Sequence, residues 1–390
     1  MVRALGIDPG TKSFDLVVID GPKVVYELSI ETVEVARNPK VLIDAIESVG
    51  DVDIIAGPSG YGTPVVCNED IIDAERFAIE ILLLSSKEDI SKGVERGELG
   101  MVVYDALAKV VKYLWRSKCR VCYIPSVILL PTVPLHRKIN RIDMGTADKL
   151  AVTALAIYDE SRRLGIRYDE TKFILVELGF GYNAVIAVDG GKVVDGYGGT
   201  LTRMGFMTIG AIDAEVVVAG RFWRRSDVFY GGVSTLCNEH NLEKALERAS
   251  IDELCSAGFT SMMESIEHHV RGMLASVKDP HEIIVSGRLS RIPKIYDDLR
   301  RRLSDAAPIV RIRGLDGARL SKEAAQGYAI LGEGIAGGYF KDLVEIMEIM
   351  IAKGTTLSWV YHPRVMEVRR KLEQTCMKVI KRKEVCKLSN

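Results

Sequence analysis

Apolar residues form two short runs that are enclosed by the same turn residues and stand 169 positions apart. The first run is Leu16 to Ile19, and the second is Val185 to Val188. An acidic residue and a glycine precede each run, and an aspartate-glycine turn and a further apolar stretch follow it. Because strands joined by tight glycine turns form hairpins, each copy predicts three antiparallel strands.

The acidic residue and the glycine before each run also correspond to one another. Asp8 and Gly10 in the first copy match Glu177 and Gly179 in the second. A glycine where a strand reverses lets backbone N–H groups approach a phosphate, and an adjacent carboxylate can hold a hydrated Mg²⁺. The repetition therefore predicts a duplicated α/β domain with two phosphate-binding turns that face each other. The alternative is that both hairpins are ordinary tight turns at a sheet edge.

The remaining periodicity extends this plan through both halves of the chain. Residues 39–49 have helical spacing and residues 53–56 form a short apolar run, which gives the order βββαβ. The second half repeats the plan after a crossing near residues 165–171, so we predict domains at residues 1–168 and 169–390. We predict further helices at residues 73–84, 101–115, 146–164, 212–220, 242–278, 292–303, 321–337 and 362–387, and further strands at residues 172–177, 184–188, 192–195, 282–285 and 309–312.

Length and charge limit the class of protein. A chain of 390 residues is long enough for two domains of about 150 to 200 residues each. Its 52 basic and 53 acidic residues give a net charge of -1, which offers no reason to expect a nucleic-acid or membrane partner. The N-terminus lacks the basic and apolar regions of a signal peptide, and the longest apolar run, residues 79–84, is too short to span a bilayer. We therefore expect a cytoplasmic protein.

The seven cysteines are scattered and odd in number, which argues against a disulfide framework. Cys119 and Cys122 have the spacing of metal or redox ligands, but a structural zinc needs four ligands and no second pair lies nearby. We therefore expect buried or partly buried thiols.

Five short segments, spread over most of residues 1–335, carry a more specific pattern. In order and spacing they resemble the acetate and butyrate kinase branch of the actin, Hsp70 and sugar kinase superfamily. Within that branch the chain looks most similar to an archaeal family grouped with the butyrate kinases. The segments are GIDPGTKS (residues 6–13), DIIAGPSGYGTP (53–64), MGTADK (144–149), ELGFG with GKVVD (177–181 and 191–195), and EIIVSG with EAAQG (282–287 and 323–327).

The resemblance implies two ribonuclease-H-like domains that enclose ATP and Mg²⁺ in an interdomain nucleotide cleft and act on a small-molecule substrate. It is also compatible with a homodimer. Asp8 is expected to hold Mg²⁺ through water, and Glu177 to form a second acidic wall. The predicted phosphate-binding residues are Gly10, Thr11, Lys12, Ser13, Gly179, Gly181 and Asn183, the adenosine residues are Ser286, Gly287 and Arg288, and the substrate-loop residues are Ser59, Gly60 and Tyr61.

The chain departs from this branch at its catalytic positions. Where acetate kinases place catalytic histidines, Met144, Asp148 and Glu177 stand instead. Pro58 replaces the arginine that would pair with a carboxylate substrate, and a buried acid needs such a partner. Arg203 and Arg288 are the candidate substitutes.

Asp148 has two interpretations. It is either the base or orienting acid for the acceptor, or a residue that stabilises the start of a helix through capping and the helix dipole. With Asp8 and Glu177 it completes the predicted catalytic set.

Two functions remain open. The first is an ATP-dependent phosphotransferase acting on a small acceptor, with a short-chain carboxylate as the first expectation. The second is a nucleotide-binding switch or scaffold, as among the actin-like and chaperone members of the superfamily. An iron-sulfur activator of the same superfamily needs a cysteine cluster that this sequence lacks.

Small residues mark two of the predicted helices and predict that these helices cross closely. In the superfamily such a crossing implies a hinge that closes over ATP and excludes water. The alternative is tight packing in a static core. The residues are Ala147, Ala151 and Ala154 on one helix and Ala324, Ala325 and Gly327 on the other.

Overall fold

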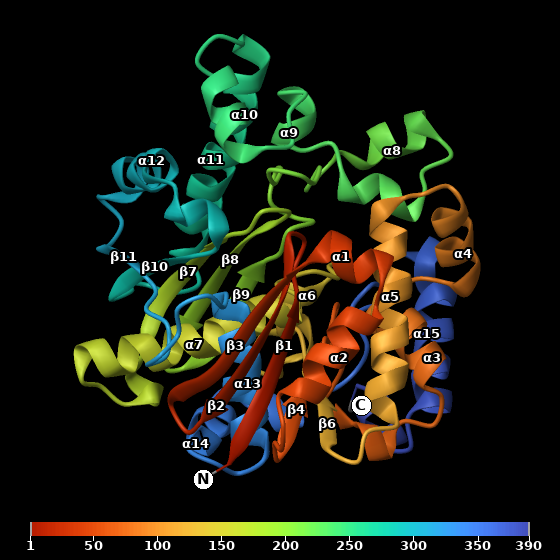
Figure 1. Cartoon of the computed structure of the whole chain (residues 1–390). Helices are drawn as coiled ribbons and strands as arrows, with labels where there is room; N and C mark the ends of the chain where they lie inside the picture. Colours follow the sequence, from red (N-terminus) through yellow and green to blue (C-terminus); the bar gives the residue numbers. More distant parts are fainter. Residues whose placement is uncertain (1, 389–390) are drawn as a thin grey trace.

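Two mixed β-sheets with helices on their faces form the framework of the protein (Figure 1). The computed structural model describes residues 2–388. The first sheet has the strand order β3-β2-β1-β4-β6-β5, and the second has the order β11-β10-β7-β8-β9. Their bounds are Arg3–Pro9 (β1), Ser13–Asp20 (β2), Lys23–Glu31 (β3), Ile54–Ala56 (β4), Val66–Cys67 (β5), Arg120–Tyr123 (β6), Lys172–Leu178 (β7), Asn183–Asp189 (β8), Lys192–Tyr197 (β9), Glu282–Ser286 (β10) and Ile309–Arg311 (β11).

The predicted duplication is confirmed down to a local irregularity. In each half the first strand pairs antiparallel with the second and parallel with the strand after the hairpins, β4 in one case and β10 in the other. The pairing register shifts between Val18 and Ile19 in the first copy and between Ala187 and Val188 in the second. These positions are 169 residues apart. The two hairpins therefore share the bounds of their first strands and their β-bulge, whereas β8 begins at residue 183 instead of 182 and β9 ends at residue 197 instead of 200.

Helices cover both sheets. The predicted helix at 242–278 is instead two helices, because Asp252 caps the second one by accepting a hydrogen bond from the Cys255 backbone N–H at 3.0 Å. The C-terminal helix is shorter than predicted, and the segment Phe77–Leu82 is π-helical. The helices are Thr32–Arg37 (α1), Lys40–Ser48 (α2), Ala74–Arg76 (α3), Lys87–Glu95 (α4), Leu99–Trp115 (α5), Leu135–Lys138 (α6), Ala147–Leu164 (α7), Ala214–Gly220 (α8), Val233–Leu236 (α9), Leu242–Arg248 (α10), Glu253–Met273 (α11), Pro293–Leu303 (α12), Glu323–Ile335 (α13), Lys341–Ile346 (α14) and Met366–Val379 (α15).

Strand alternation divides the apolar side chains among three cores. On the outer face of the first sheet, Leu5 and Val18 pack with α5 and α15. On the outer face of the second sheet, Ile174 and Val185 pack with α11 and α12. The central core contains the inner faces of both sheets together with α7 and α13. Because successive strand residues point to opposite faces, each buried strand contributes to two of these cores.

The two helices of the central core cross as closely as their small residues predict. A Cβ atom added at Gly327 of α13 would overlap the carbonyl group of Ala151 in α7. One added at Gly6 of β1 would overlap the Ala325 carbonyl oxygen of α13. Helix α13 thus lies against the N-terminal sheet, although it comes from the C-terminal half. The division at residues 168 and 169 stays a prediction, with α13 and α15 returning to the first half.

The expectation of free thiols is wrong for six of the seven cysteines. Disulfides join Cys67 to Cys122, Cys237 to Cys255 and Cys376 to Cys386, and Cys119 alone is free. Cys67 and Cys122 are direct neighbours across strands β5 and β6, a pairing that sequence spacing does not reveal. Such bonds are typical of oxidising compartments and also occur inside hyperthermophilic cells. The metal or redox interpretation of Cys119 with Cys122 is excluded, because Cys122 is already paired.

Within residues 2–388, none of the helices is both long and apolar enough to cross a membrane.

A buried carboxyl on α7 is expected to make stability depend on pH. Glu160 accepts a hydrogen bond from the Lys172 backbone N–H at 2.8 Å, and burial raises the pKa of Glu160 to about 7, with the Glu282 carboxylate adding to the rise. The folded state therefore keeps a proton that the unfolded chain releases, so stability falls as pH rises toward 7. We expect the free energy of unfolding to fall by about 1–2 kcal/mol between pH 6 and 8, and Glu160→Gln to abolish this fall.

Urea unfolding at both pH values measures the effect. His281 lies 3.5 Å from Glu160, so His281→Gln serves as the second variant. Persistence of the pH dependence in Glu160→Gln and its loss in His281→Gln would assign the titration to the histidine and contradict the prediction.

Candidate functional site

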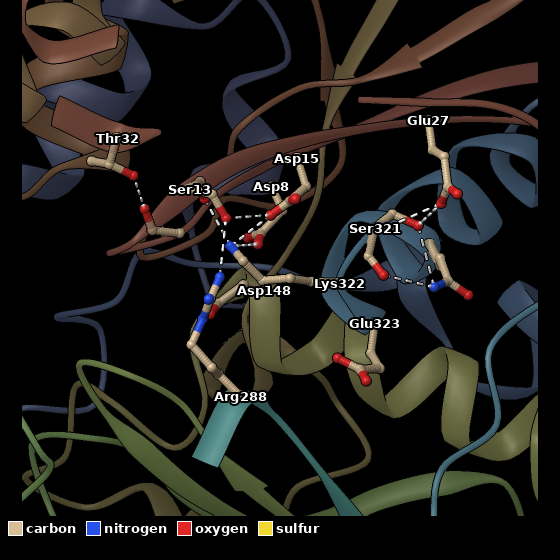
Figure 2. Close-up of polar contacts among 12 residues, drawn as sticks. Asp8, Ser13, Asp15, Glu27, Thr32, Asp148, Arg288, Ser321, Lys322 and Glu323 are labelled. Carbon is tan, nitrogen blue, oxygen red and sulfur yellow. Dashed lines mark hydrogen bonds and ion pairs between the residues drawn. The ribbon is translucent and has the colours of Figure 1, made fainter. Parts of the chain in front are cut away.

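An ammonium group lies between two buried carboxylates at the turn of the first hairpin. Lys322 Nζ is 3.2 Å from Asp8 Oδ2 and 2.7 Å from Asp15 Oδ2, and it donates a hydrogen bond to the Ser13 carbonyl oxygen at 2.7 Å. Figure 2 shows this side chain reaching from the start of α13 to the end of β1. Burial raises the pKa of Asp8 to about 6, although the Lys322 ammonium opposes the rise. The first turn is thus a compact, buried charge cluster.

The segment before α13 holds Lys322 in place. Glu27 on β3 accepts hydrogen bonds from the backbone N–H groups of Arg319 and Leu320 at 2.8 and 2.9 Å. It also accepts one from the Ser321 hydroxyl at 2.8 Å, which Figure 2 shows. With the Ser321 backbone N–H, which donates at 3.0 Å, four donors on one carboxylate tie residues 319–321 to the first sheet. Lys322 follows directly, so its backbone is fixed relative to the hairpin.

A second buried lysine links the second hairpin to the start of α7. Lys149 Nζ lies 2.7 Å from Glu177 Oε2, at the end of β7, and 2.9 Å from Asp148 Oδ2. Burial raises the pKa of Glu177, and the Lys149 ammonium partly offsets this rise. Burial also acts to raise the pKa of Asp148, but the Lys149 charge and the Thr146 hydroxyl lower it below its usual range. Asp148 is therefore an ionised group with weak basicity, and its Thr146 contact places it in the first turn of α7.

The two hairpin turns converge. A Cβ atom at Gly181 would lie 2.6 Å from the Thr11 hydroxyl oxygen, so the turns of the two halves meet at this point. Arg288, after β10, reaches the Ser13 hydroxyl at 3.5 Å. The charge of Asp148 contributes to the raised pKa of both Asp8 and Glu177, so all three carboxylates share one electrostatic environment.

The donor groups at the first turn suit a hydrated Mg²⁺. Mg²⁺ keeps several waters and usually binds through one or two carboxylates together with phosphate oxygens. Asp8 and Asp15 supply two adjacent carboxylates, and Asp15 Oδ1 is buried without a hydrogen-bond partner. No cluster of three or more histidine, cysteine, aspartate or glutamate side chains that could hold a metal occurs in the part of the chain that the structure describes. The set therefore fits a magnesium ion that shares its coordination with a nucleotide, and does not fit an ion held by protein alone.

Several predicted residues have structural roles that their motifs did not indicate. Asn183 is fully buried and donates its amide to the Met204 carbonyl at 3.2 Å. Ser59 is fully buried, accepts a hydrogen bond from the Ile124 N–H at 2.9 Å and donates one to the Gly57 carbonyl at 2.8 Å. Gly287 has a φ of 90° and lies against the Leu178 backbone, which explains why a glycine stands there without any ligand.

The other predicted residues divide between the cluster and the surface. Gly10 lies against the Lys322 amine, and Gly179 closes the second turn against the Tyr182 carbonyl. Thr11 and Lys12 are exposed at the first turn, Gly60 and Tyr61 approach the Leu82 carbonyl, and Ser286 is fully buried. Arg203 pairs instead with Glu264 of α11 at 3.3 Å, with both side chains half exposed, and lies outside the charge cluster.

Sequence reasoning missed Asp15, Lys322 and the contribution of Lys149. Asp15 had a usable signal, because it is a charged residue inside an otherwise apolar strand. Lys149 belonged to a recognised motif but was not assigned a role. Lys322 lies at the start of the helix predicted at residues 321–337 and more than 300 residues from its partners, so only the fold brings them together.

The sequence of this chain matches the model of one protein family. A family described as "Protein of unknown function (DUF1464)" matches residues 6–362. The chain belongs to this family. No curated protein matches its sequence.

Two kinases are among the solved structures that are similar to this DUF1464 protein. A propionate kinase from Francisella tularensis subsp. tularensis SCHU S4 has a TM-score of 0.56 at 12% identity, over 84% of this chain and 98% of the kinase. An acetate kinase from Porphyromonas gingivalis has a TM-score of 0.53 at 14% identity, over 89% of this chain and all of the kinase. The predicted fold class of two ribonuclease-H-like domains is confirmed for the DUF1464 chain. The closer affiliation with an archaeal butyrate kinase-like family stays a prediction.

Proposed function

We propose that this protein is an ATP-dependent phosphotransferase that phosphorylates a small acceptor, with a short-chain carboxylate as the first candidate. The observation that carries the proposal is the meeting of two acidic hairpin turns with two cations, Lys322 and Arg288, at the first of them. Phosphoryl transfer depends mainly on positioning and charge neutralisation, and these groups serve both.

Each residue has a proposed task. Asp8 and Asp15 hold Mg²⁺ through water, and the ion, when bound, neutralises charge on the phosphate chain. Lys322 and Arg288 contact phosphate oxygens, while Thr11 and Gly181 enclose the phosphate chain where the two turns meet. An acceptor oxygen forms a bond to the γ-phosphorus as the bond to ADP breaks, so a carboxylate acceptor yields an acyl phosphate.

Asp148 is more suited to orienting the acceptor than to removing its proton. Its pKa is lowered below the usual range, and a strong interaction with Lys149 keeps it ionised. A good general base has a pKa near the working pH. The lowered pKa of Asp148 is therefore compatible with an acceptor that is already deprotonated, as a short carboxylic acid is at neutral pH.

A nucleotide-dependent switch without a small acceptor is the second candidate. The replacement of the substrate-loop arginine by Pro58 and the absence of the family histidines favour it. The close crossing of α7 and α13 is compatible with either function, because both require the two halves to move on one another. A cytoplasmic location and a homodimer stay predictions for both, and a small-molecule substrate stays a prediction for the phosphotransferase.

The two candidate functions differ in whether a small acceptor stimulates the release of ADP from ATP. We expect Mg-ATP to raise the melting temperature and a short carboxylate to stimulate ADP release, with hydroxylamine trapping the acyl phosphate as a hydroxamate. Sugars and amino acids form the comparison panel. Stabilisation by Mg-ATP without stimulation by any acceptor would favour the switch, and a melting temperature unchanged by Mg-ATP would contradict both candidates.

A further inference from the structure

A buried tyrosine of α13 contacts the substrate loop, which comprises residues 57–64. The Tyr328 hydroxyl accepts a hydrogen bond from the Ser59 backbone N–H at 3.5 Å, and both side chains are fully buried. Among residues 2–388, no other residue of α13 forms a hydrogen bond with this loop. Helix α13 comes from the C-terminal half and the loop from the N-terminal half, so Tyr328 links the two.

The substrate loop is also joined to the start of α7. The Ala147 backbone N–H donates to the Gly60 carbonyl oxygen at 3.1 Å, and Asp148 follows Ala147 in the first turn of this helix. A further hydrogen bond, from the Tyr61 N–H to the Leu82 carbonyl oxygen at 2.9 Å, holds the loop against the π-helical segment. Because the loop and the first turn of α7 are joined, a residue that holds the loop also helps to place Asp148.

Helix α13 connects this loop to the nucleotide side of the site. Lys322, which contacts Asp8 at 3.2 Å, precedes the helix directly. Tyr328 stands six positions after Lys322, which is about 9 Å along a helix. Burial raises the pKa of Tyr328, and the charges of Asp148 and Asp8 add to this rise. The hydroxyl therefore keeps its proton and shares the electrostatic environment of both carboxylates.

We propose that Tyr328 is a positioning residue that fixes the substrate loop, and with it the acceptor, relative to the phosphates at the start of α13. This inference rests on the proposed phosphotransferase function. In transfer, an acceptor oxygen bonds to the γ-phosphorus as the bond to ADP breaks. When the acceptor is misplaced, water attacks the same phosphorus instead, and ADP, phosphate and a proton are released. A displacement of about 1 Å can cost about 100-fold in rate, so a fixed loop favours transfer over hydrolysis.

Tyr328→Phe tests the proposal, because it removes the hydroxyl and keeps the ring. With acetate and propionate as acceptors and hydroxylamine as the trap, we expect kcat for hydroxamate formation to fall by about 10- to 100-fold with a nearly unchanged KM for the acid. Phosphate release should increase relative to hydroxamate formation. A purely structural role would instead reduce both products in equal proportion, together with the shift in melting temperature that Mg-ATP produces.

Tyr123→Phe is the matched control. The Tyr123 ring lies against Gly57 of the same loop, and its hydroxyl is buried without a hydrogen-bond partner among residues 2–388. This variant therefore also removes a buried phenol oxygen beside the loop, but it breaks no hydrogen bond. We expect its kcat, its ratio of the two products and its response to Mg-ATP to equal those of the unmodified protein.

Hydrogen exchange of the substrate loop provides a readout that needs no turnover. Mass spectrometry of the peptide that covers residues 57–64 should show about 10-fold faster exchange in Tyr328→Phe than in Tyr123→Phe or the unmodified full-length protein. Hydrogen bonds in active sites often shorten when ligands bind, so Mg-ATP should slow this exchange in the unmodified protein. Tyr328→Phe should lose the slowing by Mg-ATP, because it breaks the contact between α13 and the loop.

The outcomes separate this inference from the proposed function. Exchange in Tyr328→Phe that equals that of the unmodified protein, or an unchanged ratio of phosphate to hydroxamate, would overturn the assignment of Tyr328. A protein that forms no hydroxamate from any acid would contradict the phosphotransferase. In that case faster loop exchange in Tyr328→Phe alone would still support the role of Tyr328 in holding the loop, and unchanged exchange would overturn it.

Discussion

Gly327→Ala is expected to destabilise the protein by about 3 kcal/mol or more. A Cβ atom at this position would overlap the carbonyl oxygen and carbon of Ala151, which belong to the backbone of α7 and cannot rotate away. Accommodation therefore requires α7 and α13 to separate, and these helices form the middle of the central core that both sheets share. Urea unfolding followed by circular dichroism measures the loss.

Gly272 provides the matched control for this substitution. It also lies within a helix, α11, but a Cβ atom there would meet no other atom within 4 Å. Gly272→Ala should be neutral or stabilising by up to about 1 kcal/mol, because alanine favours the helix more than glycine does. Equal stability changes in the two variants would show that the crossing of α7 and α13 is looser than its geometry indicates.

The hairpin duplication was predictable because its signal is local. Aspartate-glycine turns and alternating apolar residues specify where a strand reverses and which face it buries. The same reasoning located the crossing helices, since small residues at helical spacing permit close backbone approach. The β-bulge that both hairpins share, at Val18 and at Ala187, was not predicted.

Only part of the site could be predicted from the sequence, because its charged residues form ion pairs with residues that are distant along the chain. Asp8 and Glu177 were found from their turns, whereas Lys322 reaches Asp8 from more than 300 residues away. The disulfides were not predicted for the same reason, because Cys67 and Cys122 become neighbours only when β5 pairs with β6.

Lys149→Met is expected to destabilise the protein by about 3–5 kcal/mol at pH 8, because it leaves Asp148 and Glu177 facing each other without a counter-charge. Burial and the Asp148 and Glu177 carboxylates act in opposite directions on the pKa of Lys149, and the carboxylates prevail and raise it, so this lysine is charged throughout the accessible pH range. Without it, the pKa values of both carboxyls rise. A carboxyl whose folded-state pKa is raised loses stability as pH increases, so the destabilisation should be larger at pH 8 than at pH 5.

Lys109→Met is the control for removing a lysine from an ion pair. Lys109 pairs with Asp105 at 2.6 Å on the exposed side of α5, where an ion pair contributes at most about 1 kcal/mol. The double variant Lys149→Met with Glu177→Gln should recover part of the lost stability, because it removes one of the two uncompensated charges. Urea unfolding of the three variants at pH 5 and pH 8 measures these changes in the free energy of unfolding. A loss in Lys149→Met that is as small as in Lys109→Met, or that is independent of pH, would mean that Lys149 does not join the start of α7 to the second hairpin through buried charge.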